Sequence, residues 1–222
     1  MSNQQQPQII ILMGRSGCGK GTQAKLFQKE FGFDYVSSGD LIRARMKKED
    51  FFGQKLRKVV NQGGLAPTFL ISQLWTEKIN DIRKKESLKG LIIDGSPRSL
   101  LEAKLMDEIF DWVEWAEIKV ILLDISDREA FNRLTKRRIC KECGRLIPWV
   151  GQFKDLKKCP QCGGRLINRP DDKPAAIRAR LDFYKKDVQP AVDYYRKQGK
   201  LFKVNGQQSI EDVYREVKKI VE

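Results

Sequence analysis

The feature that most constrains the fold is a glycine-rich loop that stands between a short apolar run and an amphipathic segment near the start of the chain. Ile9–Met13 is continuous and apolar, as expected of a parallel strand that is buried on both faces. The loop Gly14-x4-Gly19-Lys20 follows directly, and apolar residues then recur at helical spacing as far as Gly32, which can end a helix. Strand, glycine loop and helix therefore stand in the order that a phosphate-binding site requires.

This loop has the chemistry to hold phosphate groups. Its backbone N–H groups can converge on phosphate oxygens, and the N-terminus of the next helix adds partial positive charge. Lys20 would reach the outer phosphates. Gly21 stands where the general pattern has Ser or Thr, and Thr22 follows one place later, so the pattern is met only in part. The alternative is a glycine-rich turn without a ligand, which the flanking strand and helix disfavour.

Further apolar runs indicate an α/β domain. Residues 91–93 and 120–123 each lead into an acid, Asp94 and Asp124, and Leu201–Val204 is typical of a last strand. Apolar strands that alternate with amphipathic segments predict a parallel sheet, whose ligands bind at the carboxyl ends of the strands. We expect Asp94 to hold Mg²⁺ through water near the phosphates, with a helix N-cap as the alternative role. For Asp124 we expect the cap.

Cysteine spacing indicates a metal site. Cys140-x2-Cys143 and Cys159-x2-Cys162 are separated by fifteen residues, a spacing typical of zinc sites with four thiolate ligands. Four protein ligands leave no open position on the metal, so the metal would be structural. The alternatives are iron, which also accepts four thiolates, and a reduced or redox-active group of cysteines. Cys18 lies in the glycine-rich loop, where we interpret it as a small side chain that fits.

Composition narrows the classes of partner. The 222 residues carry 43 Lys and Arg against 29 Asp and Glu, a net charge of +14 that favours polyanions such as nucleic acid, acidic lipid or phosphorylated small molecules. The chain has no histidine, so acid–base or metal chemistry must use carboxylates, lysine or cysteine. The longest apolar run is far too short for a bilayer, and the first residues lack the pattern of a secretory signal. We therefore expect a cytoplasmic protein without a membrane partner.

Ordered motifs through nearly the whole chain carry a family resemblance. They are GRSGCGKGTQ, SSGDLIRA, DGSPRS, RLTKRR, the four-cysteine insert, NRPDD followed by Arg178, and VNGQQ. With these motifs the chain resembles the adenylate kinase family, in its long-lid form with a zinc-binding lid.

The resemblance implies a P-loop kinase-type fold, in which a parallel sheet is flanked by helices. It implies one core over residues 1–222 that contains a mobile monophosphate-binding segment, 37–66, and a small zinc-binding lid, 136–172. The implied activity is reversible transfer of the γ-phosphoryl group of Mg-ATP to AMP, giving two ADP, with ATP and AMP as partners and Mg²⁺ and structural Zn²⁺ as cofactors. A closed lid would exclude water, which competes with the monophosphate as acceptor.

The resemblance also implies the residues of the site, by motif match. Those that would hold the donor are Gly14, Ser16, Gly17, Cys18, Gly19, Lys20, Gly21, Thr22, Arg133, Arg137 and Gln208. Those that would bind the monophosphate are Ser38, Arg43, Gly95, Arg98, Glu102, Arg169 and Arg178. Those that would assist the transfer itself are Lys20, Asp94, Arg98, Arg137, Arg169 and Arg178. Asp171 and Asp172 match acids that fix the lid through pairs with arginines.

Four positions depart from the family pattern. Ser16 stands where the loop usually has Pro, Ser96 where Phe is usual, and Ser38 where members selective for AMP usually have Thr. Glu102 stands where a Gln reads the adenine of the monophosphate. A Gln amide both donates and accepts, whereas an ionised Glu only accepts, a pattern that suits guanine N1–H and N2–H₂ better than adenine. We expect AMP as the main acceptor with selectivity relaxed or shifted toward GMP, unless Glu102 turns to solvent.

Two further classes remain as alternatives. A zinc ribbon on a basic P-loop ATPase would bind nucleic acid, but the basic residues are spread along the chain without one dense tract. A kinase for UMP or CMP would share the fold, but such relatives generally have a short lid, and the cysteine insert counts against them. The sequence leaves the oligomeric state open.

Overall fold

The structure is a computed structural model that describes residues 6–85, 87–169 and 172–222. Its main sheet consists of β1 (Gln8–Met13), β2 (Asp34–Ser37), β3 (Gly90–Asp94), β4 (Ile118–Asp124) and β8 (Leu201–Asn205). The helices are α1 (Lys20–Phe31), α2 (Ser38–Met46), α3 (Phe51–Asn61), α4 (Thr68–Arg83), α5 (Leu100–Trp112), α6 (Asp127–Lys136), α7 (Pro174–Phe183), α8 (Gln189–Lys197) and α9 (Ile210–Val221). Shorter elements are β5 (Arg138–Cys140), β6 (Leu146–Ile147), a 3₁₀ turn η1 (Gly151–Asp155), β7 (Leu166–Asn168) and a π-helical turn η2 (Tyr184–Val188).

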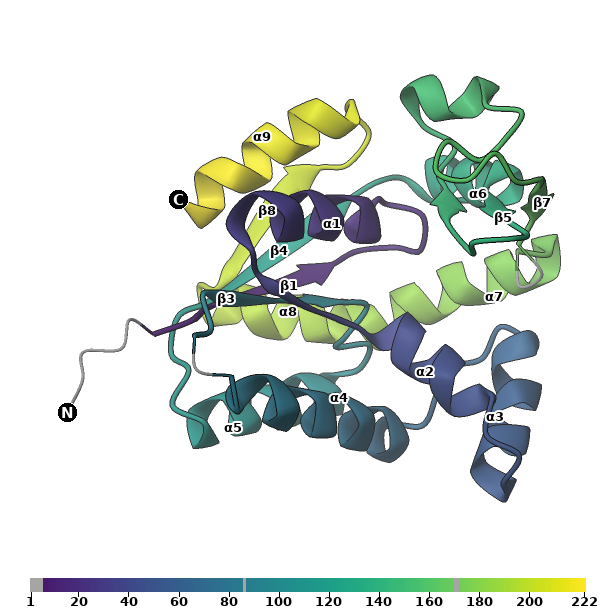
Figure 1. Ribbon diagram of the computed structural model, residues 1–222. Coiled ribbons are helices and arrows are strands. Elements are labelled where there is room, and N and C mark those ends of the chain that lie inside the picture. Colours follow the sequence, from purple (N-terminus) through teal and green to yellow (C-terminus); the bar gives the residue numbers. More distant parts are fainter. Residues whose placement is uncertain (1–5, 86, 170–171) are drawn as a thin grey trace.

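All strand pairs of the main sheet are parallel, in the order β2-β3-β1-β4-β8. β1 lies in the middle, where Ile9 is in register with Leu91 on one side and with Ile118 on the other. Helices cover both faces of this sheet (Figure 1). The predicted α/β class with a parallel sheet flanked by helices is confirmed.

The two faces of β1 enter two different cores. Ile9 and Ile11 pack into a cluster with helices α4, α5 and α8, whose large buried members include Trp75, Phe110 and Tyr195. Ile10 and Leu12 pack on the opposite side into a second cluster, whose buried members from α1, α6, α7 and α9 include Ala24, Phe27, Leu134, Ile177 and Val217. Because successive side chains of a strand point to opposite faces, an unbroken apolar run is what two cores require.

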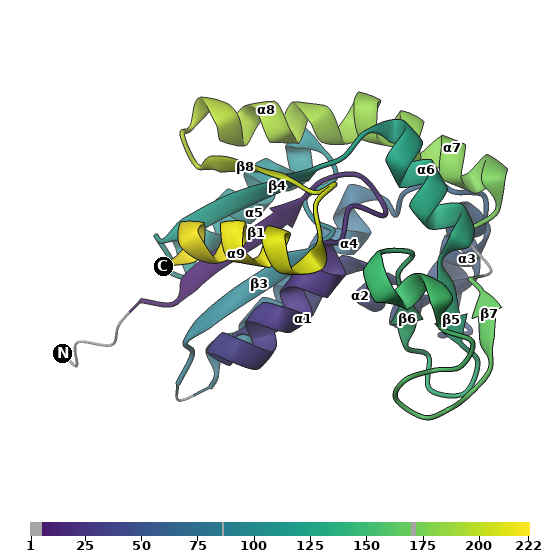
Figure 2. The same cartoon turned by 90° about the horizontal axis from the view of Figure 1, so that it is seen from above.

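Two smaller pieces project from the main sheet. α2 and α3 extend from β2 on one side, and a three-stranded antiparallel sheet, β6-β5-β7, lies between the end of α6 and the start of α7 on the other (Figure 1, Figure 2). These pieces lie within segments 37–66 and 136–172, whose roles stay predictions. α2 directly follows the carboxyl end of β2, and α6 joins the small sheet to the carboxyl end of β4, at the edge where ligands of such folds bind.

Neither Asp124, for which we expected a cap role, nor Asp94, for which the cap was the alternative, is a helix N-cap. Ser126 is the N-cap of α6, where its side chain accepts from the N–H of Glu129, and Asp124 instead ends β4. Ser99 is the N-cap of α5, which removes the cap alternative for Asp94. Serine suits the N-cap because its short side chain reaches the N–H groups of the first turn.

None of the helices in the described part of the chain is long and apolar enough to span a membrane.

Candidate functional site

The glycine-rich loop joins β1 to α1 and encloses the ammonium group of Lys20. Gly14, Gly17 and Gly19 have positive φ angles of 136°, 85° and 108°, which residues with a Cβ rarely adopt. Lys20 Nζ donates to the carbonyl oxygens of Gly14 at 2.8 Å and of Arg15 at 3.1 Å. No side chain caps the described N-terminus of α1. An anion that enters the loop would therefore meet the Lys20 charge and the N–H groups of a helix end together.

The carboxylate of Asp94 lies at the end of β3 against the first turn of α1. Its Oδ2 accepts a hydrogen bond of 3.0 Å from the hydroxyl of Tyr35, whose pKa is raised by burial and by the negative charge of Asp94. A Cβ on Gly21 would lie 3.2 Å from the same oxygen, which explains glycine where the general loop pattern has Ser or Thr. Asp94 thus offers an oxygen of the kind that Mg²⁺ prefers, beside the phosphate loop. Tyr35 orients it, a contact between distant residues that no motif signals.

Cationic side chains gather around a cavity at the carboxyl edge of the sheet. Its lining includes Ser16, Lys20, Gly95, Arg98, Arg180 and Tyr184. Arg98 Nε donates to the carbonyl of Gly95 at 2.6 Å. Burial lowers the pKa of Arg98, and the positive charges of Arg180 and Arg43 lower it further. The negative charges of Glu102 and Asp94 act in the opposite direction and raise it. Positive groups that repel one another in this way are favourable neighbours for a phosphate.

Arg178, which the resemblance places in this site, points elsewhere. Its guanidinium carbon lies 5.7 Å from the centre of the Phe131 ring on α6, whereas Arg180 lines the cavity. Two positions along an α-helix rotate a side chain by about 200°, so these two arginines cannot face the same cavity. In this structure Arg180, and not Arg178, lines the cavity, and a role of Arg178 in the site stays a prediction. Arg180 was missed because the sequence R-A-R does not show which arginine faces inward.

Asp172 binds two arginines at the base of the small sheet. Arg137 donates to both of its oxygens at 2.7 Å, and Arg180 donates to Oδ1 at 2.7 Å. Although burial raises the pKa of Asp172, these arginines hold it below its usual range. The N–H of Asp172 donates to the carbonyl of Arg169 at 3.0 Å. The predicted pairing of Asp172 with arginines is therefore present, while Asp171 lies outside the described residues.

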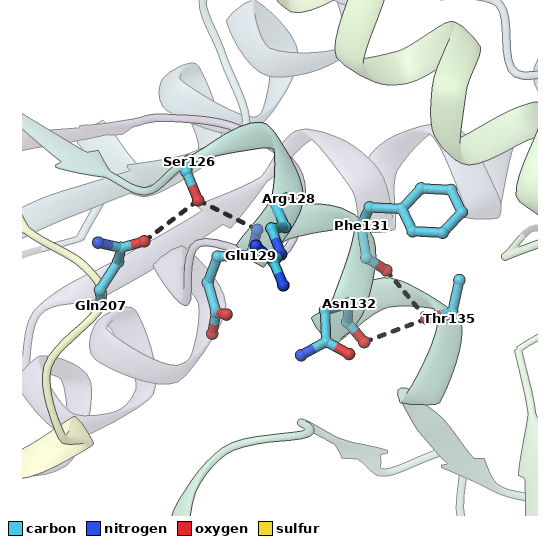
Figure 3. A pocket seen from close by; sticks show the side chains of 7 residues that line it. All are labelled: Ser126, Arg128, Glu129, Phe131, Asn132, Thr135 and Gln207. Carbon is cyan, nitrogen blue, oxygen red and sulfur yellow. Dashed lines mark hydrogen bonds between the residues drawn. The ribbon is translucent and has the colours of Figure 1, made fainter.

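A second cavity, of about 490 Å³, lies along α6 (Figure 3). It is lined by Ser126, Arg128, Glu129, Phe131, Asn132, Thr135 and Gln207. Arg133 is buried, and its Nε donates to Glu129 Oε1 at 2.6 Å. Gln208 donates instead to Glu216 on α9 at 2.7 Å. Gln208, which we predicted to bind the donor, is thus turned away from this cavity. Its neighbour Gln207 faces the cavity instead, because consecutive residues of the turn point in different directions.

Glu102 is buried at the N-terminus of α5, with 2% of its surface exposed. Its Oε2 accepts from the N–H of Arg98 at 2.7 Å, and its own N–H donates to Ser99 Oγ at 3.1 Å. Burial raises the pKa of Glu102, while Ser96 and the Arg98 N–H oppose the shift. Ser96 Oγ also lies 2.5 Å from Ser38 Oγ, and both serines are buried. The alternative that Glu102 faces solvent is therefore wrong.

The four cysteines of the small sheet converge on one point. Their sulfur atoms all lie within 4.8 Å of one another, with 3.5 Å between Cys140 and Cys162 and 3.6 Å between Cys143 and Cys159. Sulfurs around a tetrahedral zinc ion at 2.3 Å would be about 3.8 Å apart, so the donor set and its spacing fit such an ion. None of the five cysteines, including the buried Cys18, forms a disulfide.

Comparison with known proteins identifies relatives along nearly the whole chain. A family model described as adenylate kinase matches residues 12–200. The chain is 35% identical to an adenylate kinase of Archaeoglobus fulgidus, over 96% of this chain and 97% of the relative. It is 36% identical to an adenylate kinase of Methanocella arvoryzae, over 94% and 96%, and 34% identical to one of Petrotoga mobilis, over 94% of each.

The cysteine cluster predicts that Cys143→Ser abolishes stoichiometric metal binding. Three thiolates hold the ion more weakly than four, and part of the folding free energy of the small sheet is lost with it. A loss of about 2 kcal/mol would lower the Tm by roughly 4–8 °C in a chain of this size. Elemental analysis and thermal unfolding measure the two effects.

Cys18→Ser is the matched control, because it removes a thiol that lies outside the cluster. It should leave the metal content unchanged. Purified protein without a bound metal ion, and with a Tm insensitive to a chelator, would contradict the metal site.

Proposed function

The chain belongs to the adenylate kinase family and is a nucleoside monophosphate kinase, and we propose that it transfers the γ-phosphoryl group of Mg-ATP reversibly to AMP, giving two ADP. The observation that carries this proposal is the cavity at the carboxyl edge of the sheet, which Lys20, Arg98 and Arg180 line together. Phosphoryl transfer requires positioning and charge neutralisation rather than a covalent intermediate. The cavity supplies positive charge from three separate elements.

The donor side of this site is the loop that precedes α1. Lys20 donates to the carbonyl oxygens of Gly14 and Arg15, and phosphate oxygens would replace these acceptors. Asp94, oriented by Tyr35, would hold Mg²⁺ through water, and that ion would neutralise charge on the donor phosphates. The remaining loop residues would contribute backbone N–H groups.

The acceptor and transfer side consists of arginines. Arg98 and Arg43 would bind the phosphate of the monophosphate, and Arg180 takes the place that the resemblance gave to Arg178. Arg137 and Arg169 stand beside Asp172, on the segment 136–172 that we propose to close over the donor. The four cysteines would hold a structural Zn²⁺ that makes this segment rigid. Segment 37–66 would close over the monophosphate.

GMP is a second candidate acceptor because Glu102, Ser38 and Ser96 stand where the family usually has Gln, Thr and Phe. When protonated, a buried Glu offers one donor and one acceptor, like the Gln amide, and so suits adenine. When ionised, it only accepts, and so suits guanine N1–H and N2–H₂. In either case the surroundings of the carboxyl must open for it to reach a base, since Glu102 is buried and its Oε2 accepts from the N–H of Arg98.

Arg180→Met should lower kcat by about 10²-fold or more, because it removes a positive charge beside the transferring group. Arg178→Met, two positions along the same helix, should lower kcat far less. Rates of ADP formation from Mg-ATP and AMP measure both. Equal losses in the two variants would contradict the assignment of Arg180 to the site.

The AMP-to-GMP ratio of kcat/KM should fall as pH rises. Burial raises the pKa of Glu102, so the protonated form, which suits AMP, persists to a higher pH than in an exposed Glu and is then lost. Glu102→Gln cannot titrate and should favour AMP by about tenfold or more at every pH. Chromatography of the diphosphates formed from each acceptor measures the ratio. An identical ratio in the parent and the variant at every pH would exclude Glu102 as a specificity residue.

A further inference from the structure

Arg15 is a residue of the phosphate loop whose side chain leaves the loop altogether. Its Nη1 donates to Asp124 Oδ1 at 3.0 Å, and its Nε donates to Asp127 Oδ1 at 2.6 Å. Asp124 is the last residue of β4, and Asp127 is the first residue of α6. Only 19% of the Arg15 side chain is exposed, so these are partly buried ion pairs between segments more than a hundred residues apart.

The same guanidinium also contacts the chain on its return from the small zinc-binding sheet. Its central carbon lies 4.5 Å from the centre of the Tyr184 ring, within the range of a cation–π contact. Tyr184 is buried and begins the π-helical turn η2, which follows α7. Lys185 in the same turn pairs with Asp127 Oδ2 at 2.6 Å. Arg15 therefore contacts both connections between the core and segment 136–172, α6 on the way out and the end of α7 on the way back.

At its other end, Arg15 belongs to the binding site for the donor phosphates. Its carbonyl oxygen accepts from Lys20 Nζ at 3.1 Å and from the N–H of Cys18 at 3.2 Å. A phosphate that attracts Lys20 would compete with this carbonyl. Occupation of the loop thus changes the hydrogen bonding of the residue whose side chain touches both connections to the lid. A ligand can shift a conformational equilibrium only if it interacts differently with the two conformations, and the change at the Arg15 carbonyl would supply such a difference.

We propose that Arg15 is a positioning residue that couples occupation of the phosphate loop to closure of segment 136–172, through Asp127 on α6 and Tyr184 at the end of α7. This inference rests on the proposed function, since closure over the donor is part of it. The π-helical turn supports it, because such turns are rare and interrupt the regular hydrogen bonding of a helix where it can shift. Lys203 offers a contrast: it pairs with Asp124 at 2.9 Å from β8 and contacts neither connection through that pair.

Arg15→Met tests the coupling through steady-state kinetics with ATP and AMP varied separately. We expect the KM for ATP to rise about five- to tenfold, as for couplings of ordinary size, while the KM for AMP changes less than about twofold. ADP formed from ATP without AMP should increase relative to transfer, because a poorly closed lid admits water. Arg15→Lys should restore the KM for ATP only in part, since an ammonium can pair with one aspartate but lacks the planar fork that contacts two carboxylates and a ring.

Hydrogen exchange gives a readout that a purely structural role would not change. In the parent protein, ATP should slow exchange in residues 127–136 and 184–188 together, and Arg15→Met should lose this linked protection. Lys203→Met is the matched control and should keep both the KM for ATP and the protection. If Arg15→Met does not fold, Asp127→Asn removes the same pair from the other side and should raise the KM for ATP in the same direction.

A lower Tm for Arg15→Met with an unchanged KM for ATP and unchanged ATP-dependent protection would overturn the proposal. Failure of the parent protein to form ADP from ATP and AMP would instead contradict the proposed function. The exchange experiment with ATP alone would still decide the coupling in that case.

Discussion

Burial of β1 on both faces fixes the position of the phosphate loop. Ile9–Met13 is hydrogen-bonded to β3 and β4 and enclosed by two separate hydrophobic clusters, so its carboxyl end has little freedom to move. The loop begins at that end. Since the neighbouring strands are parallel, Asp94 and Asp124 end at the same edge and lie beside it.

Electrostatics at this edge follows a simple arrangement. Cations outnumber acids in the chain, and at this edge of the sheet several of them are held by a few oxygen acceptors. Asp172 binds Arg137 and Arg180, and the carbonyl groups of the loop bind Lys20. Each contact keeps a positive group close to where phosphate would bind, at a small cost in conformational entropy when the ligand enters. Asp172 thus holds Arg137 and Arg180 in defined positions in the structure.

Ser38, Ser96 and Glu102 are buried together, and all three depart from the family pattern. This departure affects both how the side chains pack and how we propose the base is recognised. A carboxyl at the third position of a helix can satisfy an N–H that precedes the helix, and Glu102 does this for Arg98. The backbone of an arginine that lines the cavity is therefore fixed by a residue that the family pattern associates with base recognition. If Glu102 also reads the base, as we propose, positioning of Arg98 and base selectivity would be linked at this residue.

The sequence by itself determined four of the five strands of the main sheet, the glycine loop, the cysteine cluster and the family. Each depends on local order and spacing: apolar runs between turns, glycines at fixed intervals, and thiols in pairs with two residues between them. The sequence did not determine which of two neighbouring side chains faces a cavity. Arg180 rather than Arg178, and Gln207 rather than Gln208, line the cavities because helix phase and turn geometry are set by packing against other elements. The enclosure of Glu102 and the contacts of Arg15 with Asp127 on α6 and Tyr184 in η2 were likewise decided only by the tertiary structure, which brings together residues that are far apart in the chain.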